Sequence, residues 1–550
     1  MIVRKKKTVD VDIYDMKYPN ISIGKTIDDQ IVEFKGGLLG QKAKIKITRN
    51  RNGYKKGKFL ELVENSYLEN NKNYCPKADI CGGCAYQKLA YETELMLKLD
   101  MIKKLFADND IDYDGDISIN RADPISGYRN KMEYTFGDSK KGGDLVLGLH
   151  RQNRFYEIVD TIDCNIVDDD FNKIRKEVQK YFRDRKTSFY HKSTREGLLR
   201  HLIIRKALRT GQIMLVLVTT SDDSFDEIRK KLFVNFVKDL ELQGEIVSIF
   251  HVINDSPADA VVAETINLIF GKDHITEEMM GLKFNISPFS FFQPNVFTAE
   301  KIYKKAFELG EIDQDTNVLD LYSGTGTITQ VMAKAAKKST GIEIVEEAVD
   351  KAYENAKINE IENIEFLCGD VLEEIDHIKG DFDLVILDPP RVGIAANALE
   401  KILKLNPEKF IYISCNPKTQ VENLKEFIAN GYKINKYEVI DQFPRSRHVE
   451  TVALLSKLNT ENHLDIEIGE DELSEIDFSK DATYGEIKKY VLDKYGLKVS
   501  SLYIAQIKRK HGLIERENYN FSKKENQRVP NCPEEKEKAI EDALEHFGMI

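Results

Sequence analysis

Residues 410–417 read Phe410-Ile411-Tyr412-Ile413-Ser414-Cys415-Asn416-Pro417. This apolar, β-branched and aromatic run, stopped by Asn-Pro, predicts a buried strand that ends in a tight loop. In an open α/β sheet, ligands collect just outside the carboxyl ends of the strands, so a nucleophile at Cys415 could meet a substrate there. On its own, the thiol would be interpreted as a small core residue, because free cysteine is among the most buried residue types. The surrounding motifs therefore decide its role.

The chain before this strand alternates strand and helix patterns. Residues 318–327 form an apolar strand that enters a glycine-rich turn, and residues 328–337 follow as a helix. Glycines in such a turn let a ligand approach the backbone at the helix N-terminus. Glu343 then ends a second strand, where it could hold ribose hydroxyls, and Asp370 ends a third. The turn alone would also suit NAD, but its Gly-Thr-Gly form, the two acids and the next motif favour S-adenosylmethionine.

That next motif is a fourth strand, residues 383–388, which ends in Asp388 and is followed at once by two prolines. A carboxylate fixed in this way has the rigid placement that a substrate-orienting group needs, whereas the alternative is a plain turn. Residues 437–444 and 445–455 follow the strand of Cys415, and the second of these segments enters another strand.

Length and composition limit the class of protein. A chain of 550 residues is too long for one core and predicts three or four domains. No apolar run approaches the ~20 residues that span a bilayer, and the start lacks a signal peptide, so we expect a cytoplasmic protein with no membrane partner. Seven cysteines, an odd number in a chain this long, argue against a disulfide framework and favour metal binding or catalysis.

The charges are unevenly distributed. The formal net charge is −11, yet residues 1–60 carry 15 Lys and Arg against 6 Asp and Glu, and residues 173–209 carry 13 against 3. Basic zones bind nucleic acids by releasing counterions from the phosphates, although a solvated charged face is the simpler interpretation of either zone alone. Two such zones that flank a cysteine cluster favour RNA or DNA as the partner.

The first basic zone coincides with short strand patterns between about Val9 and Val63, which are separated by glycines. Closely spaced, half-buried strands with glycine turns predict a small β-barrel, and the basic segment 42–58 suggests that the barrel lies on a nucleic-acid backbone. The pattern resembles the TRAM module, an OB-like RNA-binding barrel.

Three cysteines follow the barrel at Cys75, Cys81 and Cys84, with five and then two residues between them. Thiolates at this spacing can converge on one soft metal centre, which would be zinc or iron–sulfur. A fourth ligand is needed, and the candidate is Cys164, far downstream. Four cysteines leave no spare coordination position, so either metal would be structural.

Basic and aromatic residues are interleaved in the region after the cysteines. Residues 127–134, 148–151 and 195–205 mix Arg, Lys and His with Tyr and apolar residues on strand patterns. Such side chains could hold phosphates while the rings stack on unpaired bases, and a sheet face with mixed residues is the alternative. These segments predict a central RNA-binding domain.

Several motifs together resemble one family. Residues 291–295 (Phe-Phe-Gln-Pro-Asn), 388–391 (Asp-Pro-Pro-Arg), 414–417 (Ser-Cys-Asn-Pro) and 448–450 (His-Val-Glu) occur in the order found in the iron–sulfur RNA uracil-5-methyltransferases. The resemblance spans about residues 8–457 and includes the cysteine cluster. Within the family the chain looks most like the 23S rRNA branch, which carries the TRAM barrel and a [4Fe–4S] cluster, whereas the tRNA branch typically lacks both.

The resemblance implies a reaction and a site. Cys415 would add to carbon 6 of uracil, the methyl group of S-adenosylmethionine would pass to carbon 5, and Glu450 would then remove the proton from carbon 5. An ordinary thiol is only partly ionised at neutral pH, so the loop of Cys415 should lower its pKa or supply a proton acceptor. Gln293, Tyr322, Glu343 and Asp388 would contact the cofactor, while Cys75, Cys81, Cys84 and Cys164 would hold the cluster.

The resemblance also implies a partner. A monomer acting on 23S rRNA is expected, with a tRNA uridine-54 type of enzyme as the alternative. An RNA-binding or chaperone protein that retains an idle methyltransferase fold is the alternative from another class. The target base would have to be turned out of its stack to reach Cys415.

The end of the chain departs from the family. Residues 461–479 carry eight carboxylates and predict a solvated linker. Beyond it, helices are expected from Thr483 to about Tyr495 and over Ser500–His511, joined by a glycine turn. The pair resembles a helix-turn-helix unit that could contact nucleic acid, although a plain helical appendage is the alternative. Cys532 is interpreted as incidental.

The expected architecture is therefore multidomain. An OB-like TRAM barrel (1–68) precedes a central α+β RNA-binding domain with the iron–sulfur cluster (69–285), and an α/β class I methyltransferase domain follows (286–458). The acidic linker (459–480) and a helical extension (481–550) complete the chain.

Overall fold

The computed structural model describes residues 8–51, 54–70, 75–152, 154–222, 224–257, 263–378, 380–457, 484–495, 497, 499, 501–511, 533–547 and 549. The chain divides into two compact units, Met1–Asn459 and Thr460–Ile550. The predicted acidic linker and Cys532 lie outside the described residues. None of the helices in the described part of the chain is long and apolar enough to cross a membrane.

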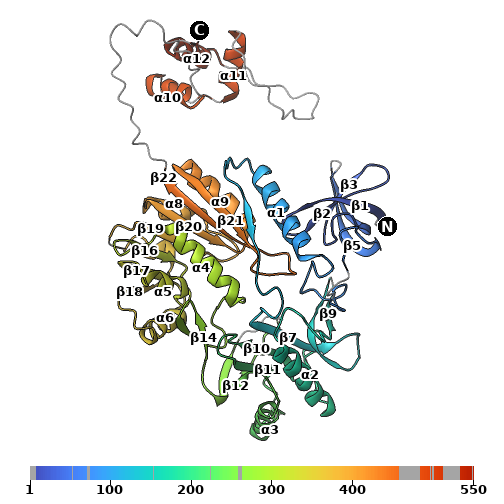
Figure 1. The fold of residues 1–550 in the computed structure, drawn as a ribbon. Coiled ribbons are helices and arrows are strands. Elements are labelled where there is room, and N and C mark those ends of the chain that lie inside the picture. The colour runs from blue at the N-terminus through green and yellow to red at the C-terminus, as the bar shows by residue number, and fades with distance from the viewer. Residues whose placement is uncertain are drawn as a thin grey trace. The chain divides into compact units, whose positions relative to one another are not determined.

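The N-terminal strands close into a small barrel in the order β1-β2-β3-β5-β4 (Figure 1). Its strands are β1 (Thr8–Lys17), β2 (Ile21–Lys25), β3 (Ile31–Lys35), β4 (Lys42–Arg51) and β5 (Tyr54–Glu64). Alternate apolar side chains such as Val11, Val32 and Ile45 fill the interior. At Gly57 a Cβ atom would lie 2.1 Å from Ile45 Cγ2, so packing requires glycine there. The predicted barrel is confirmed.

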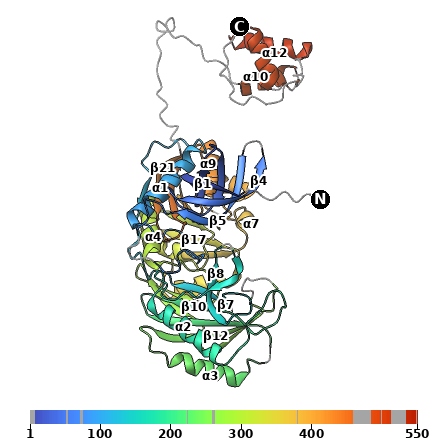
Figure 2. The same cartoon turned by 90° about the vertical axis from the view of Figure 1, so that its right-hand side faces the viewer.

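The central region is a seven-stranded sheet in the order β13-β12-β11-β10-β7-β8-β9. Its strands are β7 (Lys131–Asp138), β8 (Leu145–Arg151), β9 (Arg154–Val159), β10 (Leu199–Lys206), β11 (Gln212–Thr219), β12 (Glu245–Ile253) and β13 (Thr265–Gly271). Helices α2 (Asp169–Asp184) and α3 (Glu227–Lys238) pack on one face through buried side chains that include Phe171, Val178 and Phe233, and Figure 2 places both helices at the end of the unit away from the barrel. The other face of the sheet is thereby turned toward the rest of the unit.

The third part is an eight-stranded sheet in the order β18-β17-β16-β19-β20-β22-β21-β6. Its strands are β16 (Asn317–Leu321), β17 (Lys338–Glu343), β18 (Ile364–Cys368), β19 (Leu384–Leu387), β20 (Lys409–Ser414), β21 (Tyr432–Ile440), β22 (Glu450–Lys457) and β6 (Ser118–Asn120). The strands from β18 to β20 are parallel, and β22 is antiparallel to both β20 and β21. The α/β methyltransferase fold predicted from the alternating pattern is confirmed.

Helices cover both faces of this sheet. They are α4 (Val296–Gly310), α5 (Thr327–Ala333), α6 (Glu346–Ile358), α7 (Val371–Glu374), α8 (Ala396–Lys404) and α9 (Pro417–Ala429). One core, with Ile302 and Ile411, lies on the side of α4, and the other, with Tyr412 and Leu424, lies on the side of α9. A hairpin of β14 (Ile275–Met279) and β15 (Leu282–Ile286) packs beside α6 and completes the first of these cores.

Two elements of the predicted central range, residues 69–285, pack with the methyltransferase sheet. Helix α1 (Tyr91–Ala107) buries Leu97, Met101 and Phe106 in the core that contains β20 and α9. Strand β6 runs parallel to β21 and forms the edge of the sheet. The predicted domain ranges follow one another along the chain. The packing is different, because α1 and β6 lie in the range predicted for the central domain but pack with the methyltransferase sheet.

A buried ion cluster ties α1 to the loop that follows β21. Lys98 Nζ lies 2.7 Å from Glu94 Oε1 and 2.7 Å from Asp441 Oδ1, and the side chains of all three residues are inaccessible to solvent. Arg445 adds a guanidinium contact of 3.3 Å to Glu94, and Tyr91 donates a hydrogen bond to Asp441. Such a cluster specifies one docking position for the helix, because a shift would leave charges buried and unpaired.

We expect Lys98→Met to destabilise the Met1–Asn459 unit by about 3–5 kcal/mol, because two carboxylates would lose their central cation inside the protein. The measurement is the shift in the midpoint of urea unfolding, monitored by circular dichroism. Lys103→Met is the matched control, since Lys103 and Asp116 form an exposed pair at 3.6 Å, which should contribute less than about 1 kcal/mol. Equal midpoints for the two variants would contradict the role assigned to the cluster.

The second unit contains three described helices, α10 (Tyr484–Tyr495), α11 (Ser501–Lys510) and α12 (Glu534–His546). The first two match the predicted pair, and the third was not predicted. All three share an apolar core that includes Ile487, Ile504 and Ile540. Lys510 lies 3.1 Å from Glu541 of α12, so part of the basic end of α11 is neutralised within the unit. The predicted helix-turn-helix contact with nucleic acid stays a prediction.

Candidate active site

A cavity of about 750 Å³ opens at the carboxyl ends of β16, β17, β19 and β20. This is the edge of the sheet at which the sequence predicts a ligand. The cavity gathers every residue predicted to act on the substrate or the cofactor, and these are Gln293, Tyr322, Glu343, Asp388, Cys415 and Glu450.

The register of two antiparallel strands places Cys415 across from Glu450. Ser414, the last residue of β20, pairs with Thr451 of β22, so the residue after Ser414 and the residue before Thr451 are neighbours. Thr451 Oγ1 also donates a hydrogen bond of 3.1 Å to the carbonyl of Ser414, which fixes this register. Directly opposite residues of an antiparallel pair have side chains about 5 Å apart. A thiol and a carboxyl group thus share one end of the cavity.

Burial dominates the protonation of this pair. Burial, together with the nearby Glu450, raises the pKa of the Cys415 thiol to about 11, although Arg391 opposes the rise. Burial and the neighbouring Asp388 raise the pKa of Glu450 well above its usual range. The expectation that the loop lowers the pKa of the thiol is therefore wrong for the protein alone. The second option, a nearby proton acceptor, stays a prediction, because the raised pKa of Glu450 favours its protonated form.

Arg391 is the cation of the site. Its side chain hydrogen-bonds to the Cys415 thiol, and both this bond and its charge lower the pKa of that thiol. The backbone of Arg391 is held in place because Asn416 Nδ2 donates a hydrogen bond of 2.8 Å to its carbonyl. Asn416 immediately precedes α9, whose N-terminus carries partial positive charge. The two loops that carry Asp388 and Cys415 are thus tied to one another.

Asp388 and Gln293 line the same cavity. Burial raises the pKa of Asp388 to about 7, so this carboxyl group can be protonated or ionised near neutral pH. Gln293 is buried, accepts a hydrogen bond of 3.3 Å from Gln442 Nε2 at its side-chain oxygen, and also hydrogen-bonds to Tyr303. A fixed amide beside a carboxyl group that can be protonated or ionised can recognise a polar ring that carries both hydrogen-bond donors and acceptors.

The glycine-rich turn after β16 forms the other end of the cavity. Tyr322 and Gly324 have positive φ angles of 68° and 55°, and no atom lies within 4 Å of the position that a Cβ of Gly324 would occupy. Glu343 ends β17 and accepts backbone hydrogen bonds from Gly324 (2.9 Å) and Val345 (3.0 Å). The open turn and the fixed carboxylate fit the amino-acid and ribose parts of S-adenosylmethionine.

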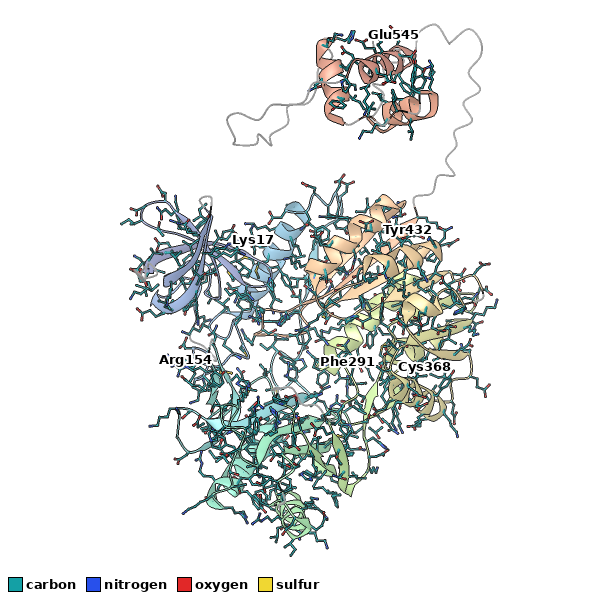
Figure 3. All side chains as sticks on the ribbon, turned by 180° about the vertical axis from the view of Figure 1, so that it is seen from behind. Lys17, Arg154, Phe291, Cys368, Tyr432 and Glu545 are labelled. Carbon is teal, nitrogen blue, oxygen red and sulfur yellow. The ribbon has the colours of Figure 1, made fainter. Side chains whose placement is uncertain are left out.

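Other lining residues surround the entrance. Phe291 is 67% exposed although it is a large aromatic residue, and Figure 3 places it between the methyltransferase sheet and the central sheet. Arg129 joins the lining from the segment just before β7. His448 lies beside them, and burial, with Arg391 nearby, lowers its pKa to about 4, so its ring is neutral at physiological pH. The mouth thus combines an exposed ring with a cation.

The barrel also contributes a residue near the catalytic pair. Tyr18 follows β1, is buried, and belongs to the same apolar core as Val449 and Tyr412. Burial, with Glu450 and Cys415 nearby, raises the pKa of its phenol well above the usual range. The barrel is therefore packed against the reaction site and is not a separate appendage.

The four predicted metal ligands line one small cavity. Cys75, Cys81, Cys84 and Cys164 all face it, between the segment before α1 and the segment before α2. Burial, with the other three thiols nearby, raises the pKa of Cys84 to about 12, and burial raises that of Cys164 to about 11. Gly83, between two of these cysteines, lines the catalytic cavity.

The described residues contain no group of three or more His, Cys, Asp or Glu side chains that could hold a metal ion. The predicted iron–sulfur site is therefore not shown, although its four residues are brought together as the spacing predicted. Their donor set still fits a thiolate-bound centre, because four half-buried cysteines around one cavity can bind a soft metal together.

The sequence did not assign a role to Arg391 or Tyr18, and it placed Arg129 only in a segment that could hold RNA phosphates. Arg391 could have been found, because it directly follows the two prolines of the Asp388 motif. Arg129 and Tyr18 reach the region through the packing of other parts of the unit, so their place at the site leaves no local pattern in the sequence.

Known proteins share this arrangement. A sequence profile described as tRNA (Uracil-5-)-methyltransferase matches residues 260–458, and one described as TRAM domain matches residues 3–60. An uncharacterized RNA methyltransferase of Caldanaerobacter subterraneus subsp. tengcongensis is 41% identical over 455 residues, which cover 82% of this chain and 99% of the relative. One from Clostridium acetobutylicum is 43% identical over 457 residues, which cover 83% and 99%.

A solved structure is also similar. The Pyrococcus abyssi tRNA (uracil-54, C5)-methyltransferase in complex with S-adenosyl-L-homocysteine has a TM-score of 0.63 and 25% identity, and the match covers 81% of this chain and 99% of that one. The matched domains, the relatives and the solved structure all indicate an RNA methyltransferase. The chain belongs to the family of RNA methyltransferases that join a TRAM domain to a (uracil-5-)-methyltransferase domain.

Proposed function

We propose that the protein methylates carbon 5 of a uridine in 23S rRNA through a covalent bond between Cys415 and carbon 6 of the base. The observation that carries this proposal is the strand register that sets Cys415 beside Glu450, within the cavity that also holds Asp388 and Gln293. Carbon 5 of uracil is a poor nucleophile, and addition of a thiolate at carbon 6 makes it electron-rich. Only a site with a nucleophile and a base at the same ring edge can complete this reaction.

Each residue has a separate task in the proposed mechanism. Arg391 stabilises the Cys415 thiolate, and Glu450 takes the proton from carbon 5 so that the thiol can be eliminated. Glu450 suits this task, since a carboxyl group of raised pKa is a stronger base once ionised. Asp388 and Gln293 orient the ring, while Tyr322 and Glu343 hold the cofactor. S-adenosylmethionine supplies the methyl group as an electrophilic sulfonium.

We expect Cys415→Ser to abolish methylation, because a serine hydroxyl is a far weaker nucleophile than a thiolate. Wild-type protein should form a denaturation-resistant adduct with RNA that contains 5-fluorouridine, since fluorine at carbon 5 blocks the proton abstraction, and the variant should form none. Cys368→Ser is the matched control, because Cys368 is exposed at the end of β18. Full methylation by Cys415→Ser would refute the mechanism, and an inactive wild-type protein would favour the idle RNA-binding alternative.

The choice of 23S rRNA rests on the resemblance, and the solved tRNA enzyme makes tRNA the second candidate. Mass mapping of 5-methyluridine in rRNA and tRNA from a deletion strain would separate the two. Loss of the modification from 23S rRNA, restored by wild-type protein and not by Cys415→Ser, is the expected result. Loss from tRNA alone would replace the proposed substrate.

We expect the alkylation of Cys415 by iodoacetamide to accelerate about tenfold per pH unit below a thiol pKa of about 11. Arg391→Gln should slow the labelling about tenfold at pH 8, because loss of the cation raises the pKa of the thiol further. Arg391→Lys, which keeps the charge, should retain most of the rate. The measurement is mass spectrometry of the Cys415 peptide, and equal rates for Arg391→Gln and wild type would exclude Arg391 as the group that stabilises the thiolate.

We also propose that Cys75, Cys81, Cys84 and Cys164 hold a [4Fe–4S] cluster. Its four irons would be bound through thiolates that surround a cavity, whereas a single zinc ion needs the sulfurs to converge on one point. The four cysteines line one small cavity, which supports a shared centre. A cluster there would brace the segment on which Gly83 reaches the catalytic cavity.

Protein purified without oxygen should be brown, with a broad visible absorbance and about four irons per chain. Cys84→Ser should lose the colour and the iron, because it removes one of the four thiolates, while Cys368→Ser should keep both. The measurement is absorbance combined with metal analysis. A colourless protein that contains zinc would contradict the iron–sulfur assignment.

A further inference from the structure

The central sheet holds a second cavity of about 650 Å³, nearly as large as the catalytic one. We call it the β9 cavity, and its walls come from β7, β8, β9, the start of β10 and the segment 189–194. Cavities of this size are typical of small-ligand sites. The cavity lies outside the proposed reaction, so its occupant must be inferred from its walls.

One face of the sheet forms the floor of the β9 cavity. Thr135 of β7 pairs with His201 of β10, and His150 of β8 pairs with Ile158 of β9, so these side chains share a face. Tyr134 and Leu202, from the alternate positions, point instead into the core with α2. The floor is therefore on the side of the sheet opposite α2.

The β9 cavity and the catalytic cavity lie along the same stretch of chain, which is β7 and the residues just before it. Arg129 lines the catalytic cavity and Thr135 lines the β9 cavity, and six residues of extended chain separate them by about 20 Å. Lys131 and Glu133, at the alternate positions between them, lie on the same face as Thr135. An RNA strand whose target base entered the catalytic cavity could thus reach the β9 cavity within a few nucleotides.

Aromatic and imidazole rings line the walls. Tyr156 is 77% exposed, which leaves most of its ring available on the floor side of β9. Phe189 and His191 contact each other with their ring centres 4.4 Å apart, and Tyr190 lies under the Arg200 guanidinium at 4.4 Å. Exposed rings beside cations are the usual platform on which unpaired bases stack.

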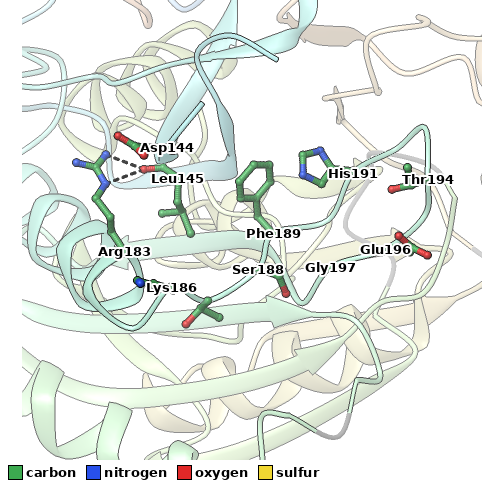
Figure 4. Close-up of a pocket in the computed structure, with 11 residues that line it drawn as sticks. Asp144, Leu145, Arg183, Lys186, Ser188, Phe189, His191, Thr194, Glu196 and Gly197 are labelled. Carbon is green, nitrogen blue, oxygen red and sulfur yellow. Dashed lines mark hydrogen bonds between the residues drawn. The ribbon is translucent and has the colours of Figure 1, made fainter. Parts of the chain in front are cut away.

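The segment that carries Phe189 and His191 also borders a third cavity. Figure 4 shows both rings projecting from this segment, with Arg183 on the opposite side donating hydrogen bonds to the Leu145 carbonyl. The closer of these two bonds measures 2.6 Å, so the guanidinium holds the start of β8 in place. Phe189 and His191 therefore lie on a segment that borders two cavities, the β9 cavity and the third one.

The charges of the β9 cavity favour a polyanion. Its two carboxylates are already engaged, since Asp138 accepts a hydrogen bond from the Gly142 amide and Glu157 accepts hydrogen bonds from Arg151 and Arg154. The cavity also has Lys141 and Lys192 in its lining, whereas Arg200 is buried and donates hydrogen bonds to the carbonyls of Asn254 and Ser256. The exposed Lys141 can attract a phosphate while the rings receive a base.

From these observations we infer that the β9 cavity binds an unpaired base of the RNA strand, a few nucleotides from the uridine in the catalytic cavity. This inference rests on the proposed function for the identity of the polymer. Its role would be to set the register of the strand, because a base stacked in one cavity fixes which base can enter the other. A protein loop with an aromatic residue is the competing occupant.

The test measures binding of the full-length protein to a fluorescent, single-stranded oligouridine by anisotropy. Tyr156→Ala should weaken binding about tenfold, because stacking on one ring contributes about 1–3 kcal/mol. Tyr156→Phe keeps the ring and should bind within about twofold of wild type. Ile228→Ala, an exposed apolar residue on the opposite side of the same sheet, is the matched control and should also leave binding unchanged.

Photo-crosslinking with 5-iodouridine in the same oligouridine supplies a second measurement, and the crosslinked peptides should include Tyr156 or the segment 189–192. His191→Ala provides an independent variant, since the residue is exposed. Wild-type affinity in both Tyr156→Ala and His191→Ala would overturn the inference and leave a protein partner for the cavity. Because no turnover is measured, failure of the Cys415 mechanism would be seen separately, in the adduct experiment.

Discussion

The antiparallel pairing of β20 with β22 is the constraint on which the reaction site depends. Parallel strands alone would place Cys415 at the sheet edge without a partner, because each of their ends is followed by its own loop. The reversed strand begins with Glu450 at the point where β20 stops, and the Thr451 side chain fixes that register. Two reactive groups from segments far apart in the sequence are thereby set side by side by backbone hydrogen bonds.

The remaining parts of the unit enclose this pair. The barrel packs Tyr18 beside it, the cysteine segment brings Gly83 to the cavity wall, and the central sheet supplies Arg129 at the mouth. Enclosure explains the protonation of the site, because excluded water is what raises the pKa of Cys415 and Asp388. Among the residues that shift the pKa of the Cys415 thiol, the cation is Arg391. Its backbone is held by Asn416, so a substrate that fills the cavity meets a thiol beside a fixed loop.

Much of this organisation was predictable from local patterns. The barrel follows from short strand patterns separated by glycines, and the parallel strands follow from apolar runs that end in short motifs, such as the one at Asp388. The roles of Gln293 and Glu450 came only from the family resemblance. The placement of α1 and β6 could not be predicted, because their sequences record an amphipathic helix and a short strand but not the sheet that they join. The β9 cavity was foreseen only as interleaved rings and cations, since its shape depends on the pairing of strands that are distant in the sequence.

The position of β6 has a consequence for the order in which the chain is synthesised. Strand β6 (Ser118–Asn120) and helix α1 leave the ribosome about 300 residues before β21 (Tyr432–Ile440), the strand that β6 must join. Domains generally fold as units from the N-terminus during synthesis. Here the apolar face of an amphipathic helix and an unpaired edge strand must wait until almost the whole unit has been translated. The interval between their emergence and their docking is therefore a period when the nascent chain is exposed to aggregation.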